Sequence, residues 1–356
     1  MARESISNSY FAWHNMAAVK SKISFYHYNE SDYVFEENAT LNHCASKDFS
    51  NHVNWINILG IEDKEILKQA AELFNIHPLV LEDIQNPNQR AKIEDYNNSL
   101  YIVLRMFSLI GDSVEDQQVS LVLRNNVLIT FREAEFGIFK KLVGEKLSNN
   151  TGGIRKKGED YLLYTLLDTI IDQYFLVIEN VEDRVEKLEQ EIFRHPHDSQ
   201  LITLQHLKSE VLYMRKNIVP VRDLITNLIR NEIEYFEADN KYYLRDLQDH
   251  MTRNVEELDF LRDQLSSLMD LYYSLQSHKM NNVMKTLTTV SFVLLPLTFI
   301  ATIYGMNFKH MPRVDDPMGF WEVIGGMGII SCVLLFIAIS RKWISTRDFR
   351  GTKGEL

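Results

Sequence analysis

Cysteine is scarce in this chain of 356 residues, which has only Cys44 and Cys332. Two cysteines exclude a small extracellular scaffold that is held together by disulfides. Basic residues are too few for nucleic acid to be a partner, because 38 Lys and Arg face 49 Asp and Glu and the formal charge is −11. The sequence also lacks a Gly-x-x-x-x-Gly-Lys-[Ser/Thr] loop and any recognisable nucleophile–base arrangement, so we expect neither an ATP-driven pump nor an enzyme.

Glycine is missing from the 146 residues between Gly158 and Gly305, where only Pro196, Pro220 and Pro296 interrupt the chain. Because glycine and proline are the residues that break helices, this stretch predicts long helices. We expect three of them, over about 160–194, about 199–230 and about 240–305. Pro296 should bend the last helix rather than end it.

The residues before Gly158 have a different pattern, that of a soluble α/β domain. Short runs rich in β-branched and aromatic residues predict strands at 23–28, 54–58, 100–107, 118–123 and 127–131. The last two should form a hairpin that turns at 124–126. Residues 63–74 have helical periodicity. We therefore predict an α+β domain over residues 1–158.

Two segments near the C-terminus are apolar enough to cross a membrane. Residues 286–308 contain no charged side chain over 23 positions, and residues 323–340 contain none over 18. A bilayer core requires about 20 apolar helical residues. The alternative is a pair of buried core helices, but such helices are usually shorter and amphipathic.

The charges that flank these segments predict their orientation. Lys279 and Lys285 precede the first span, and basic residues outnumber acidic ones in the tail 341–356, whereas the intervening loop carries more acids than bases. Positive flanks mark the cytoplasmic side, so we expect both termini in the cytoplasm.

The third long helix carries two different faces. Apolar residues recur at three- and four-residue spacing from Leu244 to Leu275, broken only by Asn254, which predicts lengthwise packing on other helices. Polar and small residues recur every seven positions from Asp249 to Gly305 and on a neighbouring row from Ser267 to Thr302. A polar row inside a membrane must face protein or water.

This polar face has two interpretations. Its Ser and Thr side chains could simply bond their own helix carbonyls and pack against the second span. The carboxylates at the N-terminal end of this face instead favour a water-filled pore. One such helix per chain cannot enclose a pore, so a ring of identical subunits is required.

The first span ends in Tyr304-Gly305-Met306-Asn307-Phe308. A ring of Asn307 amide oxygens could hydrogen-bond the water shell of a cation without removing it. This suits Mg²⁺, which dehydrates reluctantly and keeps several waters. Conduction also requires weak binding, which neutral oxygens provide better than carboxylates.

This pentapeptide, placed after the first of two C-terminal spans, resembles the signature of the CorA family of divalent-cation channels. Residues 298–301, 311–312, 76–84 and 160–164 are similar to the family as well. The resemblance extends over nearly the whole chain and is weakest in the first 50 residues. It implies a homopentameric funnel, with long stalk helices between the cytosolic domain and the two membrane helices.

The resemblance also implies roles for individual residues. The selectivity filter would comprise Gly305, Met306 and Asn307. The pore would be lined by Asp270, Asn281, Met284, Leu287, Leu295 and Thr298. Cytosolic Mg²⁺ would be sensed between subunits, at Asp83 with Asp246 of a neighbouring copy and in a second region with Glu82, Asp168 and His250.

The expected domain order follows from these assignments. It is a cytosolic domain at 1–158, a helical stalk at 159–282, a pore helix at 283–308, an outer loop at 309–319, a second membrane helix at 320–340 and a basic tail at 341–356. We expect a channel-like Mg²⁺ importer of the inner or plasma membrane, driven by the membrane potential and gated by cytosolic Mg²⁺.

The remaining expectations concern the ion, the alternative functions and the partners. Mg²⁺ would be both substrate and regulatory ligand, and Co²⁺ is a second candidate ion. A transporter of Co²⁺, Ni²⁺ or Zn²⁺ stays open as an alternative, although the polar face offers oxygen donors and Met284 but no His or Cys. A non-conducting, membrane-anchored coiled-coil scaffold is the other alternative. The expected partners are further copies of the chain and the lipid bilayer.

Overall fold

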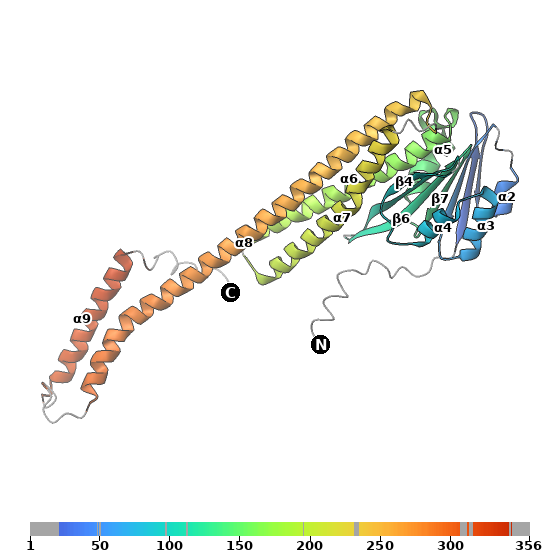
Figure 1. Ribbon diagram of the computed structural model, residues 1–356. Helices are drawn as coiled ribbons and strands as arrows, with labels where there is room; N and C mark the ends of the chain where they lie inside the picture. The colour runs from blue at the N-terminus through green and yellow to red at the C-terminus, as the bar shows by residue number, and fades with distance from the viewer. Residues whose placement is uncertain are drawn as a thin grey trace. The chain divides into compact units, whose positions relative to one another are not determined.

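The structure is a computed structural model that describes residues 21–47, 49, 51–96, 98–111, 113–194, 196–230, 235–306, 312, 316–341 and 343 (Figure 1). The chain divides into two compact units, with the boundary between Leu268 and Met269. The first unit contains a mixed sheet and long helices. The second contains the two apolar helical segments.

The first unit is built on a seven-stranded sheet in the order β2-β1-β3-β7-β6-β5-β4. All neighbouring strands are antiparallel except β3 and β7, which are parallel. The strands are β1 (Lys22–Tyr28), β2 (Tyr33–Glu37), β3 (Val53–Leu59), β4 (Lys92–Asp95), β5 (Leu100–Ile110), β6 (Ser113–Arg124) and β7 (Val127–Arg132). The five predicted strands and the hairpin at 124–126 are confirmed, whereas the edge strands β2 and β4 had not been predicted.

Helices cover the sheet. One face packs its Ile56 and Ile58 side chains into a core with three short helices, α2 (Leu41–Ala45), α3 (Lys64–Phe74) and α4 (Pro78–Gln85). Side chains alternate along a strand, so Trp55 lies on the other face, against Phe139 of the π-helix η1 (Phe139–Gly144). The first long helix, α6, packs on β5, β6 and β7 (Figure 1). The helix α5 (Glu145–Asn149) and the 3₁₀-helix η2 (Thr151–Lys156) connect η1 to α6.

The long helices occur where glycine is missing, and the three that the sequence predicted are confirmed. They are α6 (Glu159–Arg194), α7 (Asp198–Arg230) and α8 (Lys241–Tyr304), with the short 3₁₀-helix η3 (Ala238–Asn240) before α8. The predicted apolar row of α8 is buried from Leu244 to Leu268, and Leu247, Leu258 and Leu265 are completely inaccessible. Asn254 in this row donates to the Ile171 carbonyl of α6 at 3.3 Å.

Three of the described helices are long and apolar enough to cross a membrane. In α6 the apolar window is 67% buried within the protein, whereas the windows of α8 and of α9 (Gly319–Ser340) are only 6% buried. Protein therefore already covers the apolar surface of α6, which identifies α6 as a core helix. The two C-terminal segments retain apolar surface that lipid can cover, in agreement with the two predicted spans.

Candidate ion pathway and carboxylate sites

The expected pore residues share one face of α8. Met284 and Leu295 are eleven residues apart, about three helical turns, and Met284 and Thr302 are eighteen apart, about five turns. Asp270, Asn281, Met284, Leu287, Leu295 and Thr298 are all exposed in the single chain. This face is open along its whole length, and around Thr298 it forms a shallow groove that also includes Ser291 and Thr302.

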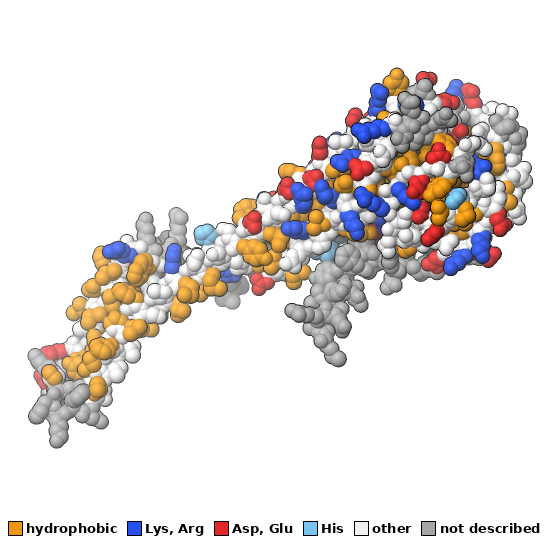
Figure 2. Space-filling view, viewed as in Figure 1, with side chains coloured by type: hydrophobic (Ala, Val, Ile, Leu, Met, Phe, Trp, Pro, Cys, Tyr) orange, Lys and Arg blue, Asp and Glu red, His pale blue; other side chains and the backbone are white. Residues whose placement is uncertain are grey.

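The opposite face of α8 is covered within its own unit. Val293 lies nine residues, or about two and a half turns, beyond Met284, and it is buried, as is Thr289. On the second helix Ala338 is fully buried, and the Trp343 ring that follows it lies edge-on to Phe292 at 5.5 Å. Hydrophobic side chains gather on the visible surface of both apolar segments (Figure 2). One face of α8 therefore packs on α9, and the polar face lies about half a turn away from it.

The threonines of the polar face do bond their own helix. The Thr298 hydroxyl donates to the Leu294 carbonyl at 2.9 Å, and the Thr302 hydroxyl donates to the Thr298 carbonyl at 2.7 Å. Both side chains nevertheless stay exposed, unlike Thr289, which is buried on the opposite face of α8. A hydroxyl whose proton is used by the backbone presents only its lone pairs outward. The open face therefore offers oxygen acceptors, which suit a cation or its water shell.

The structure describes only part of the expected selectivity filter. Gly305 follows the last residue of α8 and donates to the Ala301 carbonyl at 3.0 Å, and the Met306 amide donates to the Ile303 carbonyl at 3.1 Å. These bonds satisfy carbonyls that the end of the helix would leave free. Both residues are exposed. Asn307, the expected outer ring, lies outside the described residues.

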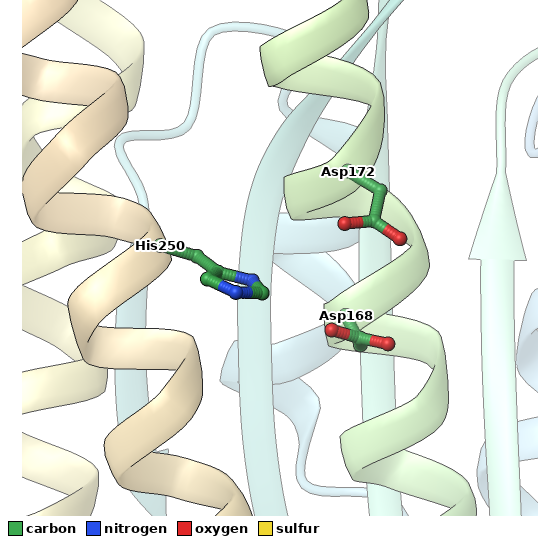
Figure 3. A group of neighbouring side chains, drawn as sticks. All are labelled: Asp168, Asp172 and His250. Atoms are coloured by element: carbon green, nitrogen blue, oxygen red, sulfur yellow. The ribbon is translucent and has the colours of Figure 1, made fainter.

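Carboxylates and an imidazole meet where α6 faces α8. Asp168, Asp172 and His250 offer ligand atoms that all lie within 4.8 Å of one another (Figure 3). His250 Nε2 is also 3.8 Å from Asp246 Oδ1, one turn earlier on α8. The structure thus brings together three of the predicted regulatory residues. It adds Asp172, which the sequence analysis missed although Asp172 stands one helical turn after Asp168.

The electrostatics of this group favour a bound cation. The pKa of Asp168 is raised from 3.8 to about 6, chiefly by burial and then by the Asp172 charge, while Lys146 and His250 partly oppose these effects. A divalent cation would compensate the repulsion between the carboxylates. Carboxylate oxygens are the ligands that Mg²⁺ prefers, and the imidazole extends the set to transition metals. The residues present therefore fit either kind of ion.

The other two predicted regulatory residues lie on α4. Asp83 is half-buried, and its Oδ2 atom is 2.7 Å from the Lys92 ammonium of β4. Lys92 also contacts Glu94 Oε2 at 2.8 Å. Glu82 is exposed and does not belong to the Asp168 group. Asp83 was expected at a Mg²⁺ site between subunits, and within the single chain its carboxylate already pairs with the Lys92 ammonium.

Comparison with known proteins places the chain among metal-ion transporters. The family described as "CorA-like Mg2+ transporter protein" matches residues 50–341. The "Cobalt/magnesium transport protein CorA" of Thermotoga maritima is 38% identical over 297 residues, which cover 83% of this chain and 84% of that protein. A more distant relative, the "Zinc transport protein ZntB" of Yersinia pestis, is 22% identical over 279 residues, or 76% of this chain and 81% of that protein.

A solved structure has the same fold. The CorA magnesium transporter of Methanocaldococcus jannaschii aligns with a TM-score of 0.78 and 22% identity, covering 92% of this chain and 100% of that one. The chain belongs to the CorA-like Mg²⁺ transporter family.

Proposed function

We propose that this protein is a channel-like importer of Mg²⁺ that the membrane potential drives and cytosolic Mg²⁺ closes. As a member of its family the chain is a metal-ion transporter and not an enzyme. The observation that carries the proposal is the face of α8 that α9 leaves uncovered. This face continues from Asp270 to Thr298, and its exposed threonine oxygens act as acceptors.

A pore on this face requires several copies of the chain. Each chain supplies one such helix, and the groove around Thr298 is open on one side. A closed ring places the polar faces around a common axis and leaves α9 outside, against lipid. Five copies are proposed from the resemblance to the family, with the ring in the inner or plasma membrane and both termini in the cytoplasm.

The membrane potential is sufficient as an energy source. Moving one elementary charge through 100 mV is worth about 2.3 kcal/mol, so a divalent ion that enters an inside-negative compartment gains roughly 4.6 kcal/mol.

Regulation is proposed at two groups of carboxylates, Asp168 with Asp172 and Asp83 with Asp246 of a neighbouring copy. Without a cation, the charge of the exposed Asp172 repels that of the half-buried Asp168. A bound Mg²⁺ removes this repulsion and favours by mass action whichever arrangement of subunits completes its ligand shell. If that arrangement is the closed ring, rising cytosolic Mg²⁺ stops influx.

The identity of the transported ion is inferred from the possible ligand atoms of the open face. The atoms of its described side chains that can bind a metal are carboxylate, amide and hydroxyl oxygens, together with the Met284 sulfur, and this set favours Mg²⁺ over metals that prefer nitrogen ligands. The names of relatives include cobalt and zinc as well as magnesium. Transport of Co²⁺ or Zn²⁺ is therefore the second candidate function.

Matched cysteine substitutions test the pore. In a Cys332→Ala background the remaining Cys44 is buried. Thr298→Cys then places one accessible thiol on the open face of α8, and Thr289→Cys places one packed thiol on the opposite face. A charged thiol reagent should block Mg²⁺ flux into liposomes with an inside-negative potential for Thr298→Cys and leave Thr289→Cys unaffected. Equal sensitivity at both positions would exclude this pore face.

A second comparison tests the ion and the filter. Mg²⁺ flux should exceed Co²⁺, Ni²⁺ and Zn²⁺ flux, and Asn307→Ala should abolish that preference. Flux of Co²⁺ or Zn²⁺ with little Mg²⁺ would keep the pore and change the substrate. No flux of any ion through folded, oligomeric protein would support the scaffold alternative.

A further inference from the structure

Lys92 holds an unusual position for a lysine. Its ammonium lies between two carboxylates, 2.7 Å from Asp83 Oδ2 and 2.8 Å from Glu94 Oε2. The side chains of Lys92 and Asp83 are only 28% and 16% exposed, so this contact is partly shielded from solvent, unlike an ordinary surface ion pair. Asp83 is on the last turn of α4, and Lys92 begins the edge strand β4.

Neighbouring contacts hold the two elements together. The Tyr96 hydroxyl donates to Glu94 Oε2 at 2.7 Å, and the Tyr96 ring stacks on His77, which caps the start of α4, at 4.8 Å. Gln118 of β6 donates to the Asp83 backbone carbonyl at 3.0 Å. The ammonium is therefore presented to the carboxylate by a fixed framework.

The ammonium also remains charged. Burial lowers the pKa of Lys92, but the hydrogen bonds to Asp83 and Glu94 outweigh this effect, and the pKa lies above its ordinary value. A positive charge at 2.7 Å neutralises the Asp83 carboxylate. It also repels a divalent cation that approaches the same oxygens.

We propose that Lys92 is a tethered competitor for Asp83, which an incoming Mg²⁺ must displace, so that Lys92 sets the Mg²⁺ concentration at which the transporter closes. This inference rests on the proposed function. Glu94 makes the exchange feasible, because its carboxylate already contacts the ammonium and retains it when the cation takes Asp83. Lys92 thus satisfies Asp83 when Mg²⁺ is scarce and weakens the binding of Mg²⁺ when it is present.

The test compares Lys92→Met with a matched control. Lys140→Met also removes an ion-paired lysine, but Lys140 lies on η1 and pairs with Glu37 at 3.0 Å on β2, the edge strand opposite to β4. Full-length protein in micelles is titrated with Mg²⁺, and protection from limited proteolysis is followed as a readout that does not depend on transport. Coupling between two bound groups typically changes affinity by about 5- to 150-fold. We expect the Mg²⁺ midpoint of Lys92→Met to fall roughly tenfold and that of Lys140→Met to stay.

Further variants define the outcomes. Lys92→Arg keeps the charge and should keep a midpoint near that of the wild type, and Lys92→Gln replaces Lys92→Met if the latter does not fold. Adding Lys92→Met to Asp83→Asn should give no gain over Asp83→Asn alone. A wild-type midpoint that Lys92→Met leaves unchanged or raises would overturn the competitor and leave the proposed regulation intact. A wild type that Mg²⁺ does not protect at all would overturn both.

Discussion

Arg105 and Asp116 form a buried ion pair whose loss should destabilise the first unit strongly. The two side chains come from diagonal positions on the paired strands β5 and β6 and are only 6% and 0% exposed. Arg105 also donates to the Pro87 carbonyl after α4, and the Tyr213 hydroxyl of α7 donates to Asp116 at 3.1 Å. The pair therefore connects the sheet with both α7 and the segment that follows Asp83.

The expected magnitude follows from this burial. Arg105→Met leaves the Asp116 carboxylate without its cation inside the protein, which typically costs about 3–5 kcal/mol. For a unit of 268 residues, each kcal/mol lowers the melting temperature by roughly 2–4 °C. Arg105→Met should therefore lower the apparent melting temperature by roughly 6–20 °C.

The double variant Arg105→Met/Asp116→Leu sharpens this prediction. It removes both charges, so most of the stability that Arg105→Met loses should return. The double variant should stay below the wild type by about 1 kcal/mol for each of the two lost hydrogen bonds, those of the Tyr213 hydroxyl and the Pro87 carbonyl. Arg262→Met is the control, because Arg262 pairs with Asp259 and Asp263 at the surface, where ion pairs contribute little to stability.

Melting of the full-length protein in micelles, followed by circular dichroism, measures all three variants. A shift of Arg105→Met no larger than that of Arg262→Met would refute the reasoning, and so would a double variant no more stable than Arg105→Met.

Two further predictions follow from burial and charge. The pKa of Asp168 is raised from 3.8 to about 6, so above pH 4 folding forces a charge into a half-buried site. Metal-free protein should therefore lose about 1–2 kcal/mol of stability, after allowance for partial exposure, as the pH rises from 4 to 7. Asp168→Asn should flatten this pH dependence of the melting temperature, and an unchanged profile would contradict it. Leu258→Ala should cost about 2–5 kcal/mol because Leu258 is fully buried in the apolar row. Leu295→Ala, on an exposed side chain, should cost little in the same melting experiment, and equal costs would contradict the assignment of the two faces.

The sequence predicted the helical part of the fold best. Long helices depend on local properties, the absence of glycine and the spacing of leucines, which are visible along the chain. The edge strands β2 and β4 were missed because they have only 5 and 4 residues and are half-exposed. The charged residues of β4, Lys92 and Glu94, are typical of sheet edges but do not resemble the alternating pattern of a half-buried strand.

The candidate sites were predicted unevenly for a related reason. Rows on a single helix, such as the open face of α8, follow from a periodicity of 3.6 residues. The family resemblance supplied Asp168 and His250, which lie on two helices and which spacing alone could not bring together. The contact between Lys92 and Asp83 depends on how β4 pairs at the edge of the sheet, beside the end of α4. No local pattern encodes that placement.

Asn254 has a consequence for how α8 can move. Its side chain lies inside an otherwise apolar row and is matched to one carbonyl of α6, that of Ile171. The leucines on either side would tolerate a slide of one heptad, but the buried amide would then lose its acceptor, which costs about 1–3 kcal/mol. The hydrogen bond from Asn254 thus fixes the axial position of α8 against α6. Tilting or twisting about this fixed point is favoured over piston-like translation as a way to carry a signal along α8.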